Sequence, residues 1–407
     1  VPYAGPRGIK ALLDGMRLLL GWEPIMEGDN IIGMFDVTGG GAISLEPGGQ
    51  FELSGAPLED VHQTASELFA HLAQLREVAK PLGIGFLGLG MAPSWSRAEM
   101  PMMPKGRYKI MTKYMPTVGR YGLDMMYRTC TVQANLDFSS EADMVKKLRV
   151  ALALQPVATA LFANSPFMEG KPNGFLSYRS HIWTDTDNQR AGTLPWAFED
   201  GMGFERWVDY ALGVPMYFIK RGDNYIDVSG KSFRDFFAGK LKELPGERPT
   251  ISDWANHLST IFPEVRLKRY LEMRGADGGP WRRLPSLTAF WVGLLYDDDA
   301  LEACWQMVKG WSAAERQKLR DDVPKLAFNA EIRGRNVLTL AQETLRFAAR
   351  GLARRKYLDG NGRDETRYLR PLEESVARGL TPAEELLEKF NGEWSGSVEP
   401  IFEEYAY

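Results

Sequence analysis

Two glutamates in a short apolar segment are the first side chains whose type and spacing point to chemistry. Residues 44–53 read Ser-Leu-Glu-Pro-Gly-Gly-Gln-Phe-Glu-Leu, with Glu46 and Glu52 on either side of Pro-Gly-Gly. Residues two apart in a strand share a face, and the kink can bring Glu46 to the face of Glu52. Two carboxylates about 5 Å apart repel by roughly 3 kcal/mol at an effective dielectric of 20. Bound Mg²⁺ or Mn²⁺ would remove that repulsion, whereas the alternative is a solvated face of an edge strand.

A second polar segment, residues 128–137, places amide and carboxylate side chains at alternating positions. Gln133, Asn135 and Asp137 share one face of the predicted strand, and the opposite face is apolar. A half-buried strand with a polar outer face accounts for this pattern. Amides interleaved with a carboxylate also suit a sheet that lines a ligand site, so both interpretations stay open.

A third segment, residues 266–277, is densely charged and ends in Gly-Ala-Asp. Glu272 and Arg274 share a strand face there. An acid that holds a metal beside an arginine that neutralises a transferring phosphoryl group is a recurring pair in phosphoryl chemistry. A surface ion pair is the alternative, and the density of charge before the glycine turn favours function.

The elements that would position these side chains alternate between strands and helices. Strands are predicted at residues 30–36, 42–53, 85–90, 123–138, 175–181, 216–220 and 267–274, and helices at 7–21, 57–81, 105–114 and 139–162. From about residue 287 the pattern is almost entirely helical. Antiparallel hairpins beside long helices predict an α+β fold. We expect a catalytic core over residues 1–285 and a mostly helical region over 286–407 packed on it, as one integrated unit.

Three other motifs have ordinary structural explanations. The Gly83-x-Gly85-x-x-Gly88 pattern follows a predicted helix instead of a strand, which disfavours dinucleotide binding. Residues 297–299 are three aspartates between helical patterns, where a helix cap is expected. Cys130 lies in an apolar run, so we expect a buried and inert thiol instead of a nucleophile paired with His181.

The composition excludes several classes of protein. The 407 residues carry 49 basic and 53 acidic side chains, a net charge of −4, so no basic field favours nucleic acid. No run of apolar residues is long enough to predict a membrane helix. Two cysteines indicate a reducing compartment or at most one bridge. The chain opens Val-Pro-Tyr without a signal-peptide pattern, so we expect either processing or further residues upstream.

Taken together, these and other segments resemble plant-type glutamate–cysteine ligases. The motifs that carry the resemblance are Glu-Gly-Asp-Asn-Ile-Ile-Gly (27–33), Ser-Leu-Glu-Pro-Gly-Gly-Gln-Phe-Glu-Leu-Ser-Gly (44–55), Met-Pro-Lys-Gly-Arg-Tyr (103–108), Asn-Leu-Asp-Phe-Ser-Ser-Glu-Ala-Asp-Met (135–144), Ala-Asn-Ser-Pro-Phe (163–167), Arg-Ser-His-Ile-Trp-Thr-Asp-Thr-Asp (179–187) and Arg-Tyr-Leu-Glu-Met-Arg-Gly-Ala-Asp-Gly-Gly-Pro-Trp-Arg-Arg (269–283). The resemblance runs from about residue 5 to residue 394.

The resemblance implies a reaction and a fold. ATP would phosphorylate the γ-carboxylate of glutamate, and the cysteine amine would displace phosphate to give γ-glutamylcysteine, the first step of glutathione biosynthesis. The implied fold is related to glutamine synthetase, with a curved antiparallel sheet around the active site and helices outside. Carboxylates, divalent cations and an arginine suit this chemistry.

The resemblance also implies a role for individual residues. Around the metal and the nucleotide it implies Glu46 and Glu52 as Mg²⁺ ligands, Glu272 and Gln133 as further ligands or phosphate neighbours, and Arg274 as the cation that stabilises the phosphoryl group. We also expect Asn135, on the same strand face as Gln133, beside ATP. Around the amino acids it implies Arg107 and Arg179 as anchors of the glutamate carboxylate with Trp183 beside them, and Tyr108 and Tyr217 as walls of the cysteine subsite. The predicted strand at 175–181 would place Arg179, His181 and Trp183 on one face.

This sequence departs from the family pattern in two places. The family begins with a segment like Gly-Thr-Glu-His-Glu-Lys-Phe, whose Glu helps to hold metal, and no such segment occurs here. The plant members carry two regulatory disulfides, and the positions that align with them are Ala65 with Pro285 and Val228 with Glu243. We therefore expect no redox switch.

Several expectations concern partners and place. We expect small-molecule substrates only, a monomer or homodimer, and a bacterial cytoplasm in preference to a plastid, because no transit-like segment is present. A related ligase with another amine acceptor and an inactive glutamate-binding homologue are the alternatives. A phosphoguanidine kinase has a similar sheet, but its guanidine substrate would need no pair of arginines that bind a carboxylate, so this alternative is disfavoured.

Overall fold

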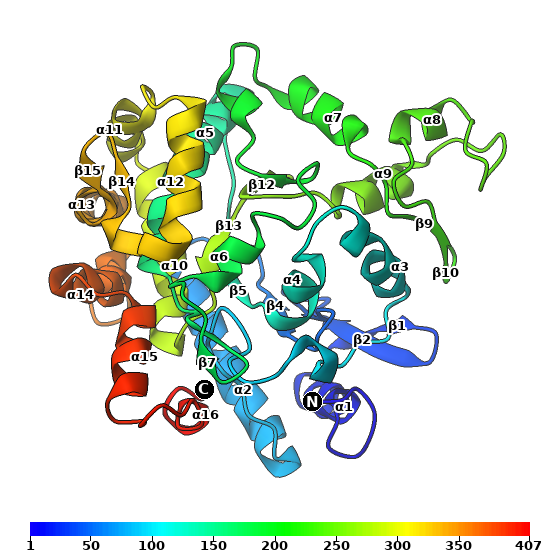
Figure 1. The fold of residues 1–407 in the computed structure, drawn as a ribbon, viewed down its shortest axis with the longest axis horizontal. Coiled ribbons are helices and arrows are strands. Elements are labelled where there is room, and N and C mark those ends of the chain that lie inside the picture. The colour runs from blue at the N-terminus through cyan, green and yellow to red at the C-terminus, as the bar shows by residue number, and fades with distance from the viewer.

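The computed structural model describes residues 1–407 and begins with a small antiparallel sheet flanked by helices (Figure 1). Its four strands run in the order β1-β2-β3-β4. The bounds are α1 (Ile9–Leu20), β1 (Glu23–Glu27), β2 (Asn30–Phe35), β3 (Ala42–Leu45), β4 (Phe51–Ser54) and α2 (Val61–Leu82). Asp60 caps α2, and Gly83 ends it in a left-handed conformation, as expected of a glycine after a helix.

The strand predicted over residues 42–53 is broken in the middle. Residues 46–50 form the turn between β3 and β4, in which the Glu46 amide donates to the Gln50 carbonyl at 2.9 Å. Gly49 has a φ of +89°, which glycine adopts without strain. Pro-Gly-Gly therefore builds a hairpin, and Glu46 lies at its start while Glu52 lies on the returning strand.

A second antiparallel sheet, in the order β12-β13-β5, lies at the centre of the molecule. Its strands are β5 (Thr131–Leu136), β12 (Val265–Leu267) and β13 (Leu271–Asp277). The register pairs Glu272 with Asn135 on one side and with Arg266 on the other. The prediction of one long strand over 123–138 was wrong in its first half, because Gly122–Arg128 is the helix α4. The expected strand at 85–90 is also absent and makes only one isolated bridge, between Leu87 and Ala406.

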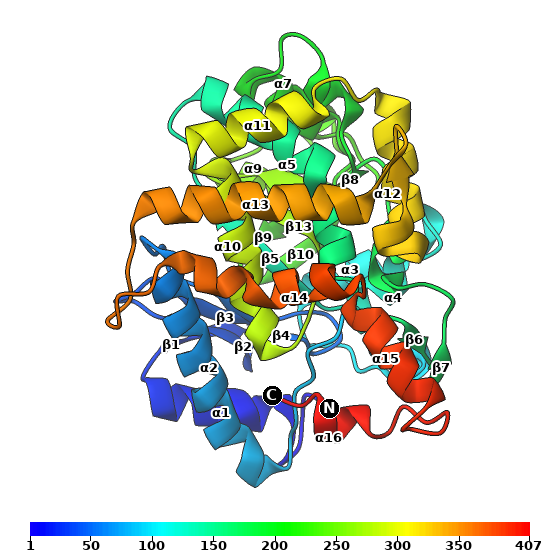
Figure 2. The same ribbon diagram turned by 90° about the vertical axis from the view of Figure 1, so that its left-hand side faces the viewer.

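Helices of the second half of the chain cover one side of this sheet. Figure 2 shows α11, α13 and α14 lying across that side. The bounds are α5 (Glu141–Leu161), α10 (Leu284–Leu295), α11 (Asp298–Val308), α12 (Ala313–Leu326), α13 (Val337–Arg355), α14 (Arg370–Arg378), α15 (Pro382–Asn391) and α16 (Ile401–Glu404). The main hydrophobic core contains residues of β5, β13, α5 and the helices α10 to α14. The helical C-terminal half therefore shares its core with the sheet that precedes it.

The segment predicted as a strand over 175–181 is a helix instead. Ser177 caps α6 (Tyr178–Ile182) by accepting a hydrogen bond from the Ser180 amide at 3.2 Å. Serine at this position satisfies a free amide at the helix start, which favours the helix over the strand that the apolar alternation predicts. Trp183 follows as the last residue of the turn.

The remaining elements surround the two sheets. They are α3 (Gly106–Tyr114), α7 (Phe204–Gly213), α8 (Phe233–Phe237), α9 (Ile251–Leu258), the hairpin β9 (Phe218–Arg221) with β10 (Asn224–Asp227), and the short pairs β6 (Phe167–Met168) with β7 (Lys171–Pro172), β8 (Ala191–Gly192) with β11 (Phe262–Pro263), and β14 (Glu331–Ile332) with β15 (Arg335–Asn336). The fold is α+β, as predicted. The strands form several small sheets, antiparallel except for the parallel pair β8–β11, whereas the resemblance implied a curved antiparallel sheet. No helix has the length and apolar character to cross a membrane.

Candidate active site

The hairpin between β3 and β4 brings Glu46 and Glu52 together. The pKa of Glu52 is raised to about 7, first by burial and then by the charge of Glu46, a hydrogen bond with Glu46 and the charge of Glu272, while Arg274 opposes the shift. Two oxygen-rich side chains that repel each other in a partly buried place match the ligand chemistry of Mg²⁺ or Mn²⁺. The donor set of this pair therefore fits a divalent cation.

The start of helix α3 contacts the same hairpin through the side chains of Lys105 and Tyr108. The Lys105 ammonium donates to the Leu45 carbonyl at 2.6 Å, and the Tyr108 hydroxyl donates to the same carbonyl at 2.8 Å. Burial lowers the pKa of Lys105 to about 8, although Glu46 and Glu52 oppose that shift. Sequence reasoning missed Lys105. Its place between a proline and a glycine at the start of a helix was the available signal.

Glu272 lies in a cationic environment on β13. Arg266 binds it in bidentate fashion at 2.6 and 3.0 Å, Lys268 lies 3.2 Å away, and the Arg274 guanidinium donates to it at 2.7 Å. Glu272 is 3% exposed, and these cations hold its pKa well below the usual range against the effect of burial. No group of three or more His, Cys, Asp or Glu side chains is arranged to hold a metal ion. The expected three-glutamate cluster is therefore not formed, and the role of Glu272 as a ligand stays a prediction.

The polar face of β5 lies beside this ion-pair network. The Gln133 amide bridges it, with its nitrogen 3.2 Å from Glu272 Oε1 and its oxygen 3.3 Å from Arg274 Nη1. Asn135 lies opposite Glu272 in the register and is exposed. The alternation of polar and buried residues along β5 confirms the predicted half-buried strand. Gln133 contacts the network directly, whereas Asn135 only borders it.

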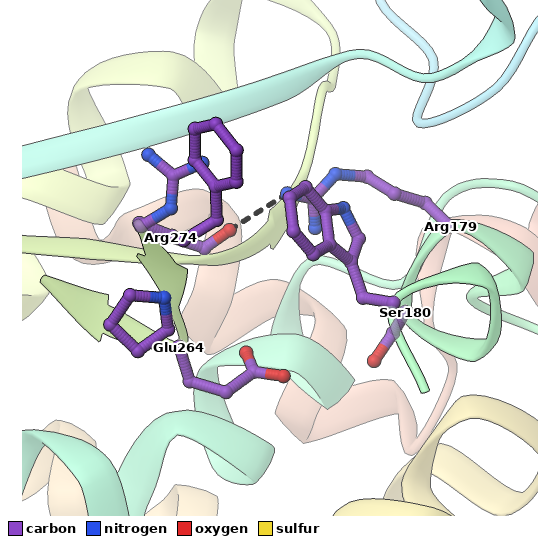
Figure 3. Close-up of a pocket in the computed structure, with 7 residues that line it drawn as sticks. Arg179, Ser180, Glu264 and Arg274 are labelled. Carbon is purple, nitrogen blue, oxygen red and sulfur yellow. Dashed lines mark hydrogen bonds between the residues drawn. The ribbon is translucent and has the colours of Figure 1, made fainter. Parts of the chain in front are cut away.

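Helix α6 and strand β13 enclose a small pocket (Figure 3). Its lining residues are Arg179, Ser180, Trp183, Phe262, Pro263, Glu264 and Arg274. The Arg179 guanidinium donates to the Arg274 carbonyl at 2.8 Å (Figure 3). Arg179 and Trp183 are four residues apart in a helical turn and so share a face. His181 does not join them, because its ring stacks on Phe175 at 4.2 Å.

Two guanidinium groups at the site, that of buried Arg179 and that of half-buried Arg107, have no carboxylate partner. Arg179 is 3% exposed, yet its guanidinium makes one hydrogen bond, to a carbonyl, and no ion pair. Arg107 likewise makes no ion pair, and its buried Nε has no hydrogen-bond partner. Arg283 differs because its two Nη atoms meet three protein acceptors. Arg107 and Arg179 are thus suited to bind a carboxylate that the protein does not itself supply.

Tyr217 lies in a buried cluster that sequence reasoning did not foresee. Its hydroxyl donates to Asp187 at 3.3 Å, and the Arg190 guanidinium lies 3.7 Å from its ring centre. Arg190 also binds Asp187 at 2.6 Å, and the ring of Tyr114 packs edge-on against Tyr217. Since its hydroxyl is already bonded, Tyr217 can contribute a rigid wall but no free polar group.

Neither cysteine has the character of a nucleophile. Burial raises the pKa of Cys130 to about 11 and that of Cys304 to about 12, and both thiols are free. The expectation of an inert Cys130 agrees with these shifts, since a thiol at such a pKa stays protonated near neutral pH.

Comparison with known proteins agrees with this geometry. Residues 1–404 match the model of glutamate–cysteine ligase family 2. The chain is 59% identical to a chloroplastic glutamate–cysteine ligase of Nicotiana tabacum and 60% identical to that of Arabidopsis thaliana, over 98% of this chain and 75% of each relative. Glutamate–cysteine ligase B of Oryza sativa, also chloroplastic, is 57% identical over 98% of this chain and 79% of its own length.

These matches cover almost the entire chain, and the sequence identities are high enough to show a shared family. They extend over the carboxylate hairpin, the ion-pair network of β13 and the buried arginine of α6 alike. The chain belongs to glutamate–cysteine ligase family 2.

Proposed function

We propose that this chain joins the γ-carboxylate of L-glutamate to the amine of L-cysteine and so forms γ-glutamylcysteine, the first step of glutathione biosynthesis. ATP is the co-substrate, and γ-glutamyl phosphate is the intermediate. The observation that carries the proposal is that the guanidinium groups of Arg107 and Arg179 have no carboxylate partner, while Arg107 lies within the field of Glu46 in the Glu46–Glu52 pair. Such a site provides cations for an amino-acid carboxylate and oxygen ligands for a divalent cation.

Each residue of the site has its own role in binding glutamate and in transferring the phosphoryl group. Arg179 grips the α-carboxylate of glutamate, Trp183 packs beside it, and Arg107 adds a second positive charge. This grip leaves the γ-carboxylate free to attack the terminal phosphorus of ATP, which releases ADP. Arg274 then balances the negative charge that develops on the transferring phosphoryl group.

Glu46 and Glu52 are the residues that would hold Mg²⁺, with Mn²⁺ as an alternative and Glu272 as a further ligand. Bound Mg²⁺ supplies charge neutralisation for the phosphates. Gln133 orients Arg274 through its amide oxygen, and Asn135 borders the nucleotide side. Tyr108 and Tyr217 form the walls of the cysteine subsite, where the amine attacks the γ-carbonyl and phosphate leaves.

The test is a reconstitution with purified chain, glutamate, cysteine, ATP and Mg²⁺. We expect γ-glutamylcysteine and ADP in equal amounts and no product when cysteine is omitted. Product with another amine but not with cysteine would identify a related ligase. Glutamate binding without ADP release would identify an inactive binding homologue. Either result would refute the proposed reaction.

Other aspects of the proposal concern the whole chain. The shared core supports treating residues 1–285 and 286–407 as one catalytic unit, and a kinship with glutamine synthetase is consistent with the two antiparallel sheets beside the site. The curated relatives are chloroplastic, which points to a plastid instead of the expected bacterial cytoplasm. The choice between monomer and homodimer stays a prediction.

A further inference from the structure

A fully buried carboxylate behind the pocket has no part in the reaction described above. Asp277 is the last residue of β13 and is 0% exposed. Its Oδ2 accepts hydrogen bonds from the Asn164 amide at 2.9 Å and the Ser165 hydroxyl at 2.7 Å. Its Oδ1 accepts from the Ser177 hydroxyl at 2.8 Å. Burial raises the pKa of Asp277, and these three donors oppose that shift because they stabilise the charged carboxylate.

The donors to Asp277 control the start of the helix that carries Arg179. Ser177 is the cap of α6, and Ser165 accepts a hydrogen bond from the Arg179 amide at 3.1 Å. The Arg179 guanidinium in turn donates to the carbonyl of Arg274, which lies three residues before Asp277 on β13. Asp277 therefore connects helix α6, which carries Arg179, to strand β13, which carries Arg274.

A glycine-rich segment seals this carboxylate from water. A Cβ at Gly90 would lie 2.6 Å from Asp277 Oδ2, and a Cβ at Gly88 would clash with the carbonyl oxygen of Gly279. The Asn164 side chain donates to the carbonyl of Gly88 at 2.9 Å. Gly90 thus permits close backbone packing over Asp277, and Gly88, the last glycine of the pattern that resembles a dinucleotide motif, permits close packing against Gly279.

We propose that Asp277 is a positioning residue for the glutamate subsite, holding Arg179 at a fixed place and orientation against Arg274. This inference rests on the proposed function of Arg179. Burial lowers the pKa of Arg179, and the charge of Asp277 opposes that shift although the two side chains make no ion pair. Because Asp277 accepts only from hydroxyl and amide donors, the guanidinium N–H groups of Arg179 that do not bind the Arg274 carbonyl stay free for the substrate carboxylate.

The test compares Asp277→Asn with a matched control. The control is Glu365→Gln, which makes the same chemical change at another carboxylate that is 0% exposed and that accepts from the Val61 amide and Arg355. Glutamate binding is measured by calorimetry on the metal-loaded enzyme, and the KM values for glutamate, ATP and cysteine are measured separately. Misplacing a binding group by about 1 Å costs roughly 100-fold, so we expect Asp277→Asn to weaken glutamate binding by about 10- to 100-fold.

We expect the KM values for ATP and cysteine to stay within about two-fold of the wild-type values. Glu365→Gln should lower the melting temperature and leave glutamate binding unchanged. If Asp277→Asn does not fold, Ser165→Ala and Ser177→Ala test the same link and should each weaken glutamate binding selectively. Unchanged glutamate binding in the folded variants, or an equal rise in all three KM values, would overturn the inference. Failure of the wild-type chain to form product would instead refute the proposed function, because the binding measurement does not depend on turnover.

Discussion

Replacing Arg179 is the sharpest perturbation of the glutamate subsite. Lysine keeps the positive charge but cannot form the two parallel hydrogen bonds of a guanidinium fork. Losing one hydrogen bond to a charged group costs about 1.5–3 kcal/mol, which is roughly one to two decades in kcat/KM for glutamate. Arg179→Met removes the charge as well. A buried substrate carboxylate left unpaired costs about 3–5 kcal/mol, or roughly two to three and a half decades.

The expected loss of kcat/KM for glutamate depends on how few other partners Arg179 has in the structure. Arg179 is 3% exposed, and its guanidinium binds no carboxylate of the protein. Neither water nor a neighbouring side chain can therefore make up for the lost interaction with the substrate carboxylate. The assay is steady-state ADP release with glutamate or ATP varied in turn. The control is Arg316→Lys, another buried arginine, which donates to the Trp311 carbonyl and covers Phe198 away from the pocket. Loss of ATP affinity with an unchanged KM for glutamate would refute the placement of the substrate.

Three further predictions follow from the carboxylate pair and the thiols. Glu52→Gln keeps the volume and removes one negative charge, so turnover should fall sharply and the Mg²⁺ requirement should rise; an unchanged Mg²⁺ titration would exclude Glu52 as a ligand. Because the pKa of Glu52 is raised from 4.5 to about 7, its contribution to the stability of the metal-free protein is present below pH 4.5 and lost as the pH rises through 7. Mg²⁺ should therefore raise the melting temperature more at pH 8 than at pH 5, and equal shifts at both pH values would contradict the assignment. Activity of freshly purified enzyme should be nearly the same with and without dithiothreitol, since both thiols are buried or part-buried with raised pKa values; a several-fold activation by oxidant would reveal a switch.

Local signals in the sequence were sufficient for most helices. Asp297 caps the helix that follows it, as predicted, and Ser312 and Thr381 cap theirs, because a cap depends on only a few neighbouring residues. The apolar alternation around Arg179 was misleading, since the cap at Ser177 outweighed the strand pattern. The helix at Gly122–Arg128 was missed for a similar reason: its Met-rich sequence suits either a strand or a buried helix.

The site was predictable in its chemistry but not in its contacts. The kink between Glu46 and Glu52 indicated their convergence, because the Pro-Gly-Gly spacing is local. The cations around Glu272 come from both strands of the β12–β13 hairpin, whose register no spacing rule supplied. Asp277 was missed because its partners lie about 100 residues away along the chain. Such long-range hydrogen bonds leave no periodic trace in a single sequence.

The most direct measurement of the proposed reaction follows oxygen from glutamate to phosphate. Glutamate labelled with ¹⁸O in its γ-carboxylate is turned over with cysteine, ATP and Mg²⁺, and the released phosphate is analysed by mass spectrometry. Attack by the γ-carboxylate on ATP predicts one ¹⁸O atom in each phosphate and γ-glutamylcysteine in equal amount. Unlabelled phosphate, or ADP released without γ-glutamylcysteine, would contradict ligation through γ-glutamyl phosphate at this site.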